Sequence, residues 1–266
     1  MAIQDNSAPR GILHSVPITD FGTFARYTPS TELLCSFVEH YWSIRWSVPE
    51  PQMRENLPHP SIHIVVERNK SGVFGVVSGK FIRTLEGTGW VFGIKFKPGA
   101  FRPLFGASVA ELTDRIVPLH ELFGPDGTAY EETMLSLTND DDKVACAEHF
   151  LSTRLPEPDE QTALIGRIVD EVMKNKQIMK VEDISERFDI GVRTLQRLFN
   201  DYVGIPPKWI IKRYRMFEAV DAVNSGAETD WTQLALELGY FDQAHFIKDF
   251  KQMVGRSPGE YRNDPR

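Results

Sequence analysis

Near its C-terminal end, the sequence repeats one spaced pattern of apolar, basic and glycine residues, and this repeat restricts the possible folds more than any other feature. The matched pairs, each separated by 51 residues, are Leu195 and Phe246, Arg197 and Lys248, Phe199 and Phe250, Val203 and Val254, Gly204 and Gly255, and Pro207 and Pro258. A spaced match of this extent rarely arises by chance. The repeat therefore indicates two copies of one supersecondary unit.

Each copy is typical of two short helices joined by a tight turn. Within residues 181–203, two runs of apolar residues follow helical spacing, and Gly191 lies between the runs. Gly204 and Gly255 suit the left-handed conformation that commonly ends a helix. The pattern predicts a helix-turn-helix unit in each copy. One unit alone would be a moderate signal, because short helix pairs are common in all-α domains.

The segment between the two units predicts one uninterrupted helix. It runs from Pro206 to Asn224, and proline suits the first positions of a helix. At 1.5 Å per residue such a helix spans about 28 Å. Two recognition helices held that far apart can enter successive major grooves of DNA, which repeat every ~34 Å.

The segment from about Val181 to Arg262 resembles the DNA-binding domain of the AraC/XylS family of transcription regulators. The matching pieces are Arg193-x-Leu-x-Arg197-x-Phe199, Gly204-Ile-Pro-Pro-Lys-Trp209, Ala235 to Lys251, and Gly255 to Arg262. Residues 161–176 are similar to the helix that opens that domain. The resemblance covers roughly the last hundred residues and implies a sequence-specific regulator of transcription.

The resemblance also implies which side chains meet DNA. Base contacts are expected from Arg193, Gln196 and Arg197 in the first unit and from Gln243, His245 and Lys248 in the second. Phosphate contacts are expected from Asn200, Lys208, Lys212 and Lys251. The alternative is that these residues form an ordinary solvated helix face.

Two positions of the second unit depart from the family pattern. Ala244 offers no hydrogen bond, and Ile247 stands where the family usually has a polar residue. Ile247 either contacts a thymine methyl group or packs in the protein. We therefore expect weaker sequence discrimination at the second unit than at the first.

The distribution of charge permits DNA binding without predicting it. The chain has a net charge of -7, with 14 basic and 21 acidic residues in 1–160 but 16 of each in 161–266. The acidic excess therefore lies outside the predicted DNA-binding part. A neutral domain can still bind DNA when its basic residues cluster on one face.

The first hundred residues predict a different kind of structure. Segments 41–48, 61–68 and 91–96 alternate apolar and polar residues, as strands with one buried face do. They indicate an antiparallel sheet or small barrel over roughly residues 20–100. With the helical end, the expected fold class is α+β.

A short acidic cluster and a proline-rich segment mark the end of this part. Asn139-Asp-Asp-Asp142 precedes an apolar periodic run, and acidic or amide side chains at that place cap a helix. Segment 155–161 has two prolines and three acids and reads as a linker. We expect a β-rich sensor or dimerisation domain with trailing helices over 1–155 and a DNA-binding domain over 156–266. The alternative is an interhelical loop within one domain.

The N-terminal part is similar to a poorly characterised β-rich domain found in some of these regulators. The similar pieces are Leu57 to Glu67, Gly75 to Phe81, and Gly93 to Gly106. The resemblance implies a cupin-like barrel and a regulatory role, without a known ligand. An effector pocket lined by apolar side chains is expected at Trp42, Trp46, Phe92 and Phe96. The alternative is that these four are ordinary core residues.

Metal and enzyme chemistry are not expected. His59 and His63, with Glu55 and Glu67 nearby, have metal-binding side chains, but residues four apart in a strand lie about 13 Å from each other. The sequence has no G-x-S-x-G, phosphate-binding glycine loop or H-E-x-x-H motif. Two cysteines are too few for a four-cysteine zinc site. We therefore expect no metal, no cofactor and no enzyme.

The combined prediction is an effector-responsive, DNA-binding transcription regulator in the cytoplasm. Its expected partners are double-stranded promoter DNA, a small-molecule effector of unknown identity, RNA polymerase and a second copy of the chain. No apolar run is long enough to span a membrane. The alternative is a cupin-like small-molecule-binding or catalytic protein whose helical half mediates protein contacts.

Overall fold

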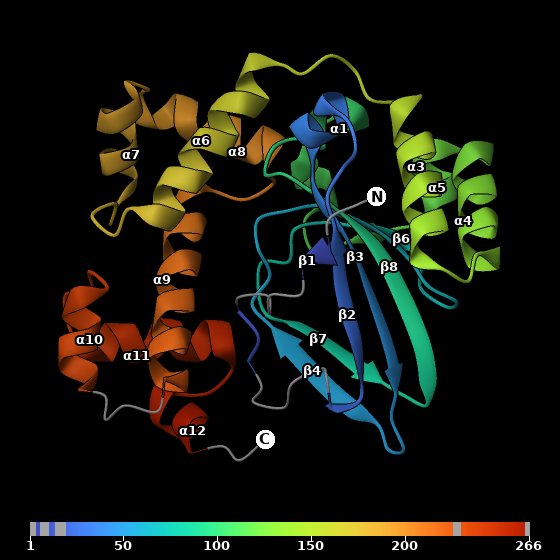
Figure 1. Cartoon of the computed structure of the whole chain (residues 1–266). Coiled ribbons are helices and arrows are strands. Elements are labelled where there is room, and N and C mark those ends of the chain that lie inside the picture. The colour runs from blue at the N-terminus through green and yellow to red at the C-terminus, as the bar shows by residue number, and fades with distance from the viewer. Residues whose placement is uncertain (1–3, 6–10, 14–19, 226–229, 264–266) are drawn as a thin grey trace.

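The fold is α+β: an antiparallel β-rich part is followed by an all-helical part (Figure 1). A computed structural model describes residues 4–5, 11–13, 20–225 and 230–263. The larger sheet has seven antiparallel strands in the order β1-β2-β3-β8-β5-β6-β9. These strands are β1 (Gln4–Asp5), β2 (Gly22–Tyr27), β3 (Val38–Ser47), β5 (His63–Val66), β6 (Gly72–Phe74), β8 (Thr88–Phe96) and β9 (Ile116–Val117).

The predicted cupin-like barrel is not confirmed. Among the described residues the seven-stranded sheet is open, with β1 and β9 at its two edges. Strands β4 (Gln52–Asn56) and β7 (Phe81–Leu85) form a separate two-stranded ribbon, and Asn56 at the end of β4 also makes an isolated bridge with Ile12. The β-rich part is therefore a sheet with a ribbon packed on it.

Both faces of the central strand β3 are covered, whereas the sequence predicted one buried face. Tyr41 belongs to the main hydrophobic cluster, and Ser43 on the same face is buried against α5 (Asp140–Ser152). Trp46 belongs to a second, smaller cluster, against which Trp42 packs. The prediction of one face was wrong because helices cover one side of the sheet and the β4–β7 ribbon covers the other.

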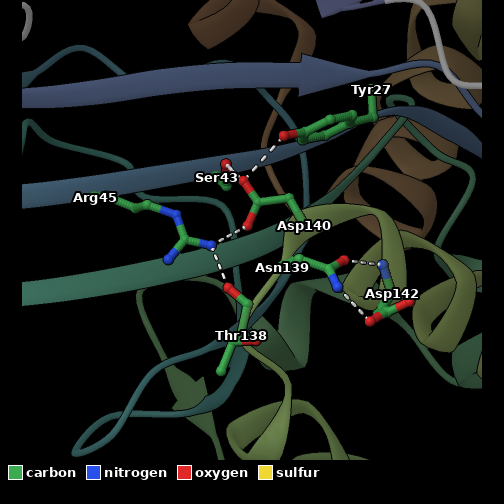
Figure 2. A network of polar contacts seen from close by, with 7 residues as sticks. All are labelled: Tyr27, Ser43, Arg45, Thr138, Asn139, Asp140 and Asp142. Atoms are coloured by element: carbon green, nitrogen blue, oxygen red, sulfur yellow. Dashed lines mark hydrogen bonds and ion pairs between the residues drawn. The ribbon is translucent and has the colours of Figure 1, made fainter.

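A network of polar contacts fastens α5 to the sheet (Figure 2). The Asp140 carboxylate accepts hydrogen bonds from Tyr27 Oη at 2.9 Å and Ser43 Oγ at 2.6 Å, and it pairs with Arg45 Nη2 at 2.6 Å. Asn139 caps the helix by accepting from the Asp142 N–H, so the predicted helix start is confirmed. Burial alone would raise the pKa of Asp140, but the hydrogen bonds from Ser43, Tyr27 and Arg45 outweigh it and hold the pKa below its ordinary value of 3.8.

Replacing Asp140 with asparagine should lower the free energy of unfolding by about 1.5 kcal/mol at pH 7, because hydrogen bonds to a charged group are lost. The folded pKa of Asp140 lies below the unfolded value, so its stabilisation is complete above about pH 4 and disappears as the pH falls through the folded pKa. Urea unfolding of Asp140→Asn and the wild type between pH 3 and pH 7 should show the two curves converging at low pH. A difference that does not depend on pH would contradict the ionic role.

The other helices of the β-rich part are short. They are α1 (Glu32–Phe37), α2 (Arg102–Phe105), the 3-10 helix η2 (Val109–Leu112), α3 (Leu119–Phe123) and α4 (Pro125–Ser136). Together with α5 they continue the main hydrophobic cluster away from the sheet.

The C-terminal part contains the predicted double helix-turn-helix arrangement. Its helices are α6 (Glu160–Lys174), α7 (Val181–Phe188), α8 (Val192–Tyr202), α9 (Pro207–Asn224), α10 (Trp231–Glu237), α11 (Gln243–Val254) and α12 (Pro258–Arg262). Gly204 and Gly255 have φ values of 87° and 90°, which is the predicted left-handed conformation. In the described ranges no helix is long and apolar enough to cross a membrane.

The connector helix α9 holds the two units at its opposite ends, with α7 and α8 near its start and α10 and α11 near its other end (Figure 1). It is buried on most sides: Ile210, Tyr214, Phe217 and seven further residues beyond Pro207 have little exposure. Such a helix acts as a rigid part of the core and fixes the distance between the units.

Candidate nucleic-acid interface

Helix α8 has one buried face and one exposed polar face. Leu195 and Phe199 are fully buried and fix the helix against the core. The predicted DNA-contacting residues of this helix, Arg193, Gln196, Arg197 and Asn200, are all exposed. In the described parts of the chain, none of these four side chains has a hydrogen-bond or ion-pair partner. They are therefore available to an external ligand, and their contacts with DNA stay predictions.

Helix α11 repeats this arrangement with fewer available side chains. His245, Lys248 and Lys251 are exposed, and Asp242 caps the helix by accepting from the His245 N–H at 2.7 Å. Gln243 is half-buried, and its side-chain oxygen accepts from Thr232 at 3.2 Å.

One of the two open interpretations of Ile247 has structural support. Ile247 is half-buried and packs against the main hydrophobic cluster, whereas Ala244 is exposed. Weaker discrimination by the second unit remains our prediction.

Lys212 already has an internal partner for its ammonium group. Its Nζ lies 2.7 Å from Asp249 Oδ2, and the Asp249 side chain is only 7% exposed. The ion pair joins α9 to α11. Lys208, by contrast, is exposed at the start of α9. The sequence did not predict this pairing with a buried acid, and the phosphate contact of Lys212 stays a prediction.

Replacing Lys212 with methionine should lower the free energy of unfolding by about 1–2 kcal/mol. The change leaves Asp249 as an uncompensated buried carboxylate, and the partial exposure of Lys212 keeps the cost below that of a fully buried pair. Thermal and urea unfolding provide the measurement, and Lys208→Met is the matched control because Lys208 is exposed. Equal stability of the two variants would show that the pair does not contribute.

Two residues of α9 that the sequence did not single out attach the helical part to the β-rich part. Trp209 Nε1 donates to the Ser78 carbonyl at 2.8 Å. Arg213 Nη2 donates to the carbonyls of Ser78 and Gly79 at 3.0 and 2.8 Å, and its side chain is fully buried. The guanidinium also lies 4.2 Å from the centre of the Trp209 ring. Burial lowers the pKa of Arg213 to about 10, so the group stays charged at neutral pH.

A neighbouring arginine joins α9 to the start of the first unit. Arg215 donates to the carbonyls of Asn175 and Ile178, at 3.2 and 2.7 Å, and pairs with Glu218. The available signal in the sequence was the presence of arginines between large apolar residues in one helix. A buried arginine needs partners, so that pattern predicts internal contacts.

The four aromatic residues of the predicted effector pocket lie in different places. Trp46 lines a cavity of about 1070 Å³ between the large sheet and the β4–β7 ribbon. Phe92 and Phe96 are fully buried in the main hydrophobic cluster, and Trp42 donates to His63 Nδ1 at 3.2 Å. Of the four, Trp46 alone is among the residues that line this cavity.

The histidines and acids considered for metal binding have other partners. His59 packs on Tyr214 and Phe217 of α9. Burial, with smaller contributions from Lys95 and His40, lowers the pKa of His63 to about 3, so it is neutral and accepts from Trp42. The acidic residues form ion pairs, Glu55 with Lys80 and Arg256, and Glu67 with Arg83. In the described residues no group of three metal-binding side chains comes together.

Two similar units at the ends of one helix make the C-terminal part a double helix-turn-helix domain. Residues 184–264 match the family described as Helix-turn-helix domain. The C-terminal part of the chain belongs to the AraC type of this domain. Residues 25–118 match a family described as Domain of unknown function (DUF6597).

The similar curated proteins each match about a third of the chain. YkgA of Escherichia coli (strain K12) is 31% identical over 85 residues, which are 32% of this chain and 35% of YkgA. The HTH-type transcriptional activator RhaS of Escherichia fergusonii is 31% identical over 81 residues, which are 30% of this chain and 29% of RhaS. The chain thus spans about a third of the length of these relatives.

The solved structures to which the chain is similar are distant in sequence. The C-terminal domain of AraT, a response regulator from Geobacillus stearothermophilus, is 24% identical with a TM-score of 0.36 and covers 39% of this chain and 87% of that one. ToxT from Vibrio cholerae O395 is 14% identical with a TM-score of 0.39 and covers 83% of this chain and 95% of that one.

Proposed function

We propose that this protein is a sequence-specific DNA-binding regulator of transcription that places α8 and α11 in successive major grooves. One observation carries the proposal: two similar helices present exposed polar faces at the two ends of one rigid connector helix. Arg193 and Arg197 lie on the first face, and His245 and Lys248 lie on the second. Regulators that contain this type of domain bind DNA, which supports the proposal.

The chemistry of the two faces fits reading of base edges. Arginine and lysine donate to the acceptors of guanine, and glutamine pairs with adenine, which suits Gln196. Asn200, Lys208 and Lys251 are exposed and suit contacts with phosphate, which position the protein without reading sequence. The first unit offers more available donors, so we propose that it contributes most of the specificity.

In the same proposal residues 1–155 sense an effector and residues 156–266 bind DNA. The support is the packing of the two parts, because Arg213 and Trp209 bind the loop at Ser78 and Gly79. A ligand in the β-rich part can then alter DNA binding through these contacts. We further propose that the protein acts in the cytoplasm without catalysis, with RNA polymerase and a second copy of the chain as partners.

The experiment that tests the function is a selection of genomic DNA fragments with the purified full-length protein. We expect one sequence to be enriched by the wild type and by Arg167→Ala, because Arg167 is an exposed arginine on α6 outside the proposed interface. Arg197→Ala should lose the enrichment. Binding should also weaken steeply as salt is raised, because several phosphate contacts release counterions. No enrichment by the wild type, with or without added metabolite extract, would overturn the proposal.

A further inference from the structure

We propose that the cavity between the large sheet and the β4–β7 ribbon binds a small organic anion with a flat apolar body, and that residues 78–83 transmit its binding to the DNA-binding helices. The second part of this inference rests on the proposed function. The first part concerns only the β-rich part of the chain and can be tested without DNA.

The size and the apolar lining of the cavity fit a flat small molecule. The volume of about 1070 Å³ is at the upper end of the range of roughly 300–1,000 Å³ that is usual for small-molecule sites. Its lining includes the aromatic residues Phe21, Trp46, Phe74 and Phe81, which belong to the smaller hydrophobic cluster on this face of the sheet. Aromatic rings stack on flat ligands with little loss of side-chain freedom.

The charged lining indicates an anion. Three basic side chains, Arg68, Lys70 and Arg83, line the cavity against two acidic ones, Glu67 and Glu86, whereas Arg45 contributes to the lining only from the strand that carries it, because its guanidinium binds Asp140 on the α5 face. Arg45 and Arg83 are already paired, with Asp140 and Glu67. Arg68 and Lys70 are exposed on the loop after β5, and neither makes an ion pair with any residue the structure describes. The cavity therefore has an excess of positive charge that an incoming anion would meet.

Arg83 is the basic residue placed to hold the anion inside the cavity. Its two terminal nitrogens donate to the Glu67 carboxylate, whose side chain is 6% exposed. Its Nε is buried and, among the described residues, has no hydrogen-bond partner. The guanidinium lies 5.4 Å from the centre of the Trp46 ring. Because Nε is not accessible from the cavity, a ligand anion would approach the partly exposed end of the Arg83 side chain beside the Trp46 ring.

The strand that lines the cavity continues directly into the segment that holds the helical part. Phe81 and Arg83 belong to β7 and line the cavity. Just before them, the carbonyls of Ser78 and Gly79 accept from Trp209 and Arg213 of α9. A ligand that moves β7 therefore moves the acceptors that hold the connector helix.

The same segment also reaches the second helix-turn-helix unit. Lys80 Nζ lies 2.6 Å from Glu55 Oε1, and Arg256 Nη2 lies 3.1 Å from Glu55 Oε2. Arg256 directly follows Gly255, which ends α11. Displacement of Lys80 would change the charge around the carboxylate that holds α11, so both the connector and the second unit respond to the ligand. The ligand changes DNA affinity only as far as its own affinity differs between the two arrangements.

The binding test uses calorimetry with the full-length protein and two matched probes, 2-naphthoate and its neutral amide, 2-naphthamide. We expect the acid to bind about tenfold more tightly than the amide, because only the acid pairs with the basic lining. The double variant Arg83→Gln, Glu67→Gln removes both partners of the buried pair together and should reduce the preference for the acid to about threefold, the part that Arg68 and Lys70 contribute. Equal binding of acid and amide by the wild type, or no saturable binding of the acid, would overturn the site.

A second pair of variants keeps the buried pair intact. The double variant Arg68→Gln, Lys70→Gln changes only exposed residues of the loop. It should weaken binding of 2-naphthoate about threefold and leave binding of 2-naphthamide unchanged. The matched control is Lys97→Gln with Arg115→Gln, two exposed basic residues outside the cavity lining, and it should bind both probes as the wild type does. If the loop variant and the control variant weakened binding of 2-naphthoate equally, the overall charge of the protein would explain the attraction. That result would overturn the role of the cavity.

The coupling is tested in the absence and in the presence of DNA. Without DNA, saturating 2-naphthoate should change amide hydrogen exchange in residues 78–80 and 207–213, and unchanged exchange there would overturn the route through residues 78–83. With a selected DNA fragment, 2-naphthoate should change the DNA affinity of the wild type about fivefold or more and leave the Arg83→Gln, Glu67→Gln variant unaffected. If the protein binds no DNA, the proposed function fails while calorimetry and exchange still decide the inference.

Discussion

Replacing Arg213 with methionine is expected to lower the free energy of unfolding by about 3–5 kcal/mol. The change leaves the carbonyls of Ser78 and Gly79 with fewer donors inside a buried contact and removes the cation above the Trp209 ring. Methionine has a similar length and keeps the apolar contacts of the stem, so the loss reports the polar contacts.

Urea unfolding of the full-length protein followed by fluorescence and circular dichroism measures this effect. Arg167→Met, a change at an exposed arginine of α6, is the matched control and should alter stability by less than about 0.5 kcal/mol. Trp209→Phe should give a smaller loss than Arg213→Met, because it removes one donor and keeps a ring. A loss from Arg213→Met as small as that from the control would contradict the role of Arg213 in joining the two parts.

Replacing Arg197 with alanine is expected to weaken binding to the selected DNA by about 1–3 kcal/mol, which is roughly 5- to 150-fold. Arg197 is exposed in the middle of α8, where its guanidinium can donate to two acceptors of one guanine. The variant should also stop discriminating among bases at one position of the site.

The comparison for Arg197 is Lys251→Ala, which should weaken selected and random DNA alike because a phosphate contact carries no sequence information. Both variants should unfold at nearly the same urea concentration as the wild type, since in the described residues neither side chain makes a hydrogen bond or a close ion pair and both are exposed. If Arg197→Ala lost the same binding free energy on selected and on random DNA, Arg197 would not read a base.

The helix-turn-helix units could be predicted from sequence because their signals are local. The spacing of Leu195 and Phe199, and the left-handed glycines Gly204 and Gly255, depend on residues within one or two turns. The connector helix could be predicted for the same reason. Gly191 lies between the two helices as predicted, directly before the first residue of α8, and Asp189, with φ of 52°, caps the end of α7.

The roles of the charged residues could not be predicted in the same way, because they depend on contacts between distant parts of the chain. Lys212 and Arg213 are neighbours in sequence, yet one pairs with Asp249 of α11 and the other binds carbonyls of residues 78 and 79. Helical spacing predicts which residues face inward, but it does not identify the acidic side chain or carbonyl that each of them contacts.

In the β-rich part, the packing of one layer on another could not be predicted from the local sequence either. Alternation in β3 predicted one inward face, and it could not reveal that the β4–β7 ribbon covers the other face and leaves a cavity beside Trp46. The cavity is lined by residues from several segments, and its key basic residue, Arg83, carries no local signal.

The contact between α9 and the loop at Ser78 and Gly79 constrains the amino-acid sequence more strongly on the α9 side than on the loop side. The loop contributes main-chain oxygens, which every amino acid possesses, whereas α9 contributes the side chains of Trp209 and Arg213. The contact itself therefore constrains the identity of positions 209 and 213 and not that of residues 78 and 79, although Ser78 Oγ also donates to Asp114 Oδ2 at 2.7 Å. A β-rich part with a different loop sequence can in consequence be recombined with this helical part, provided that the loop keeps its length and path.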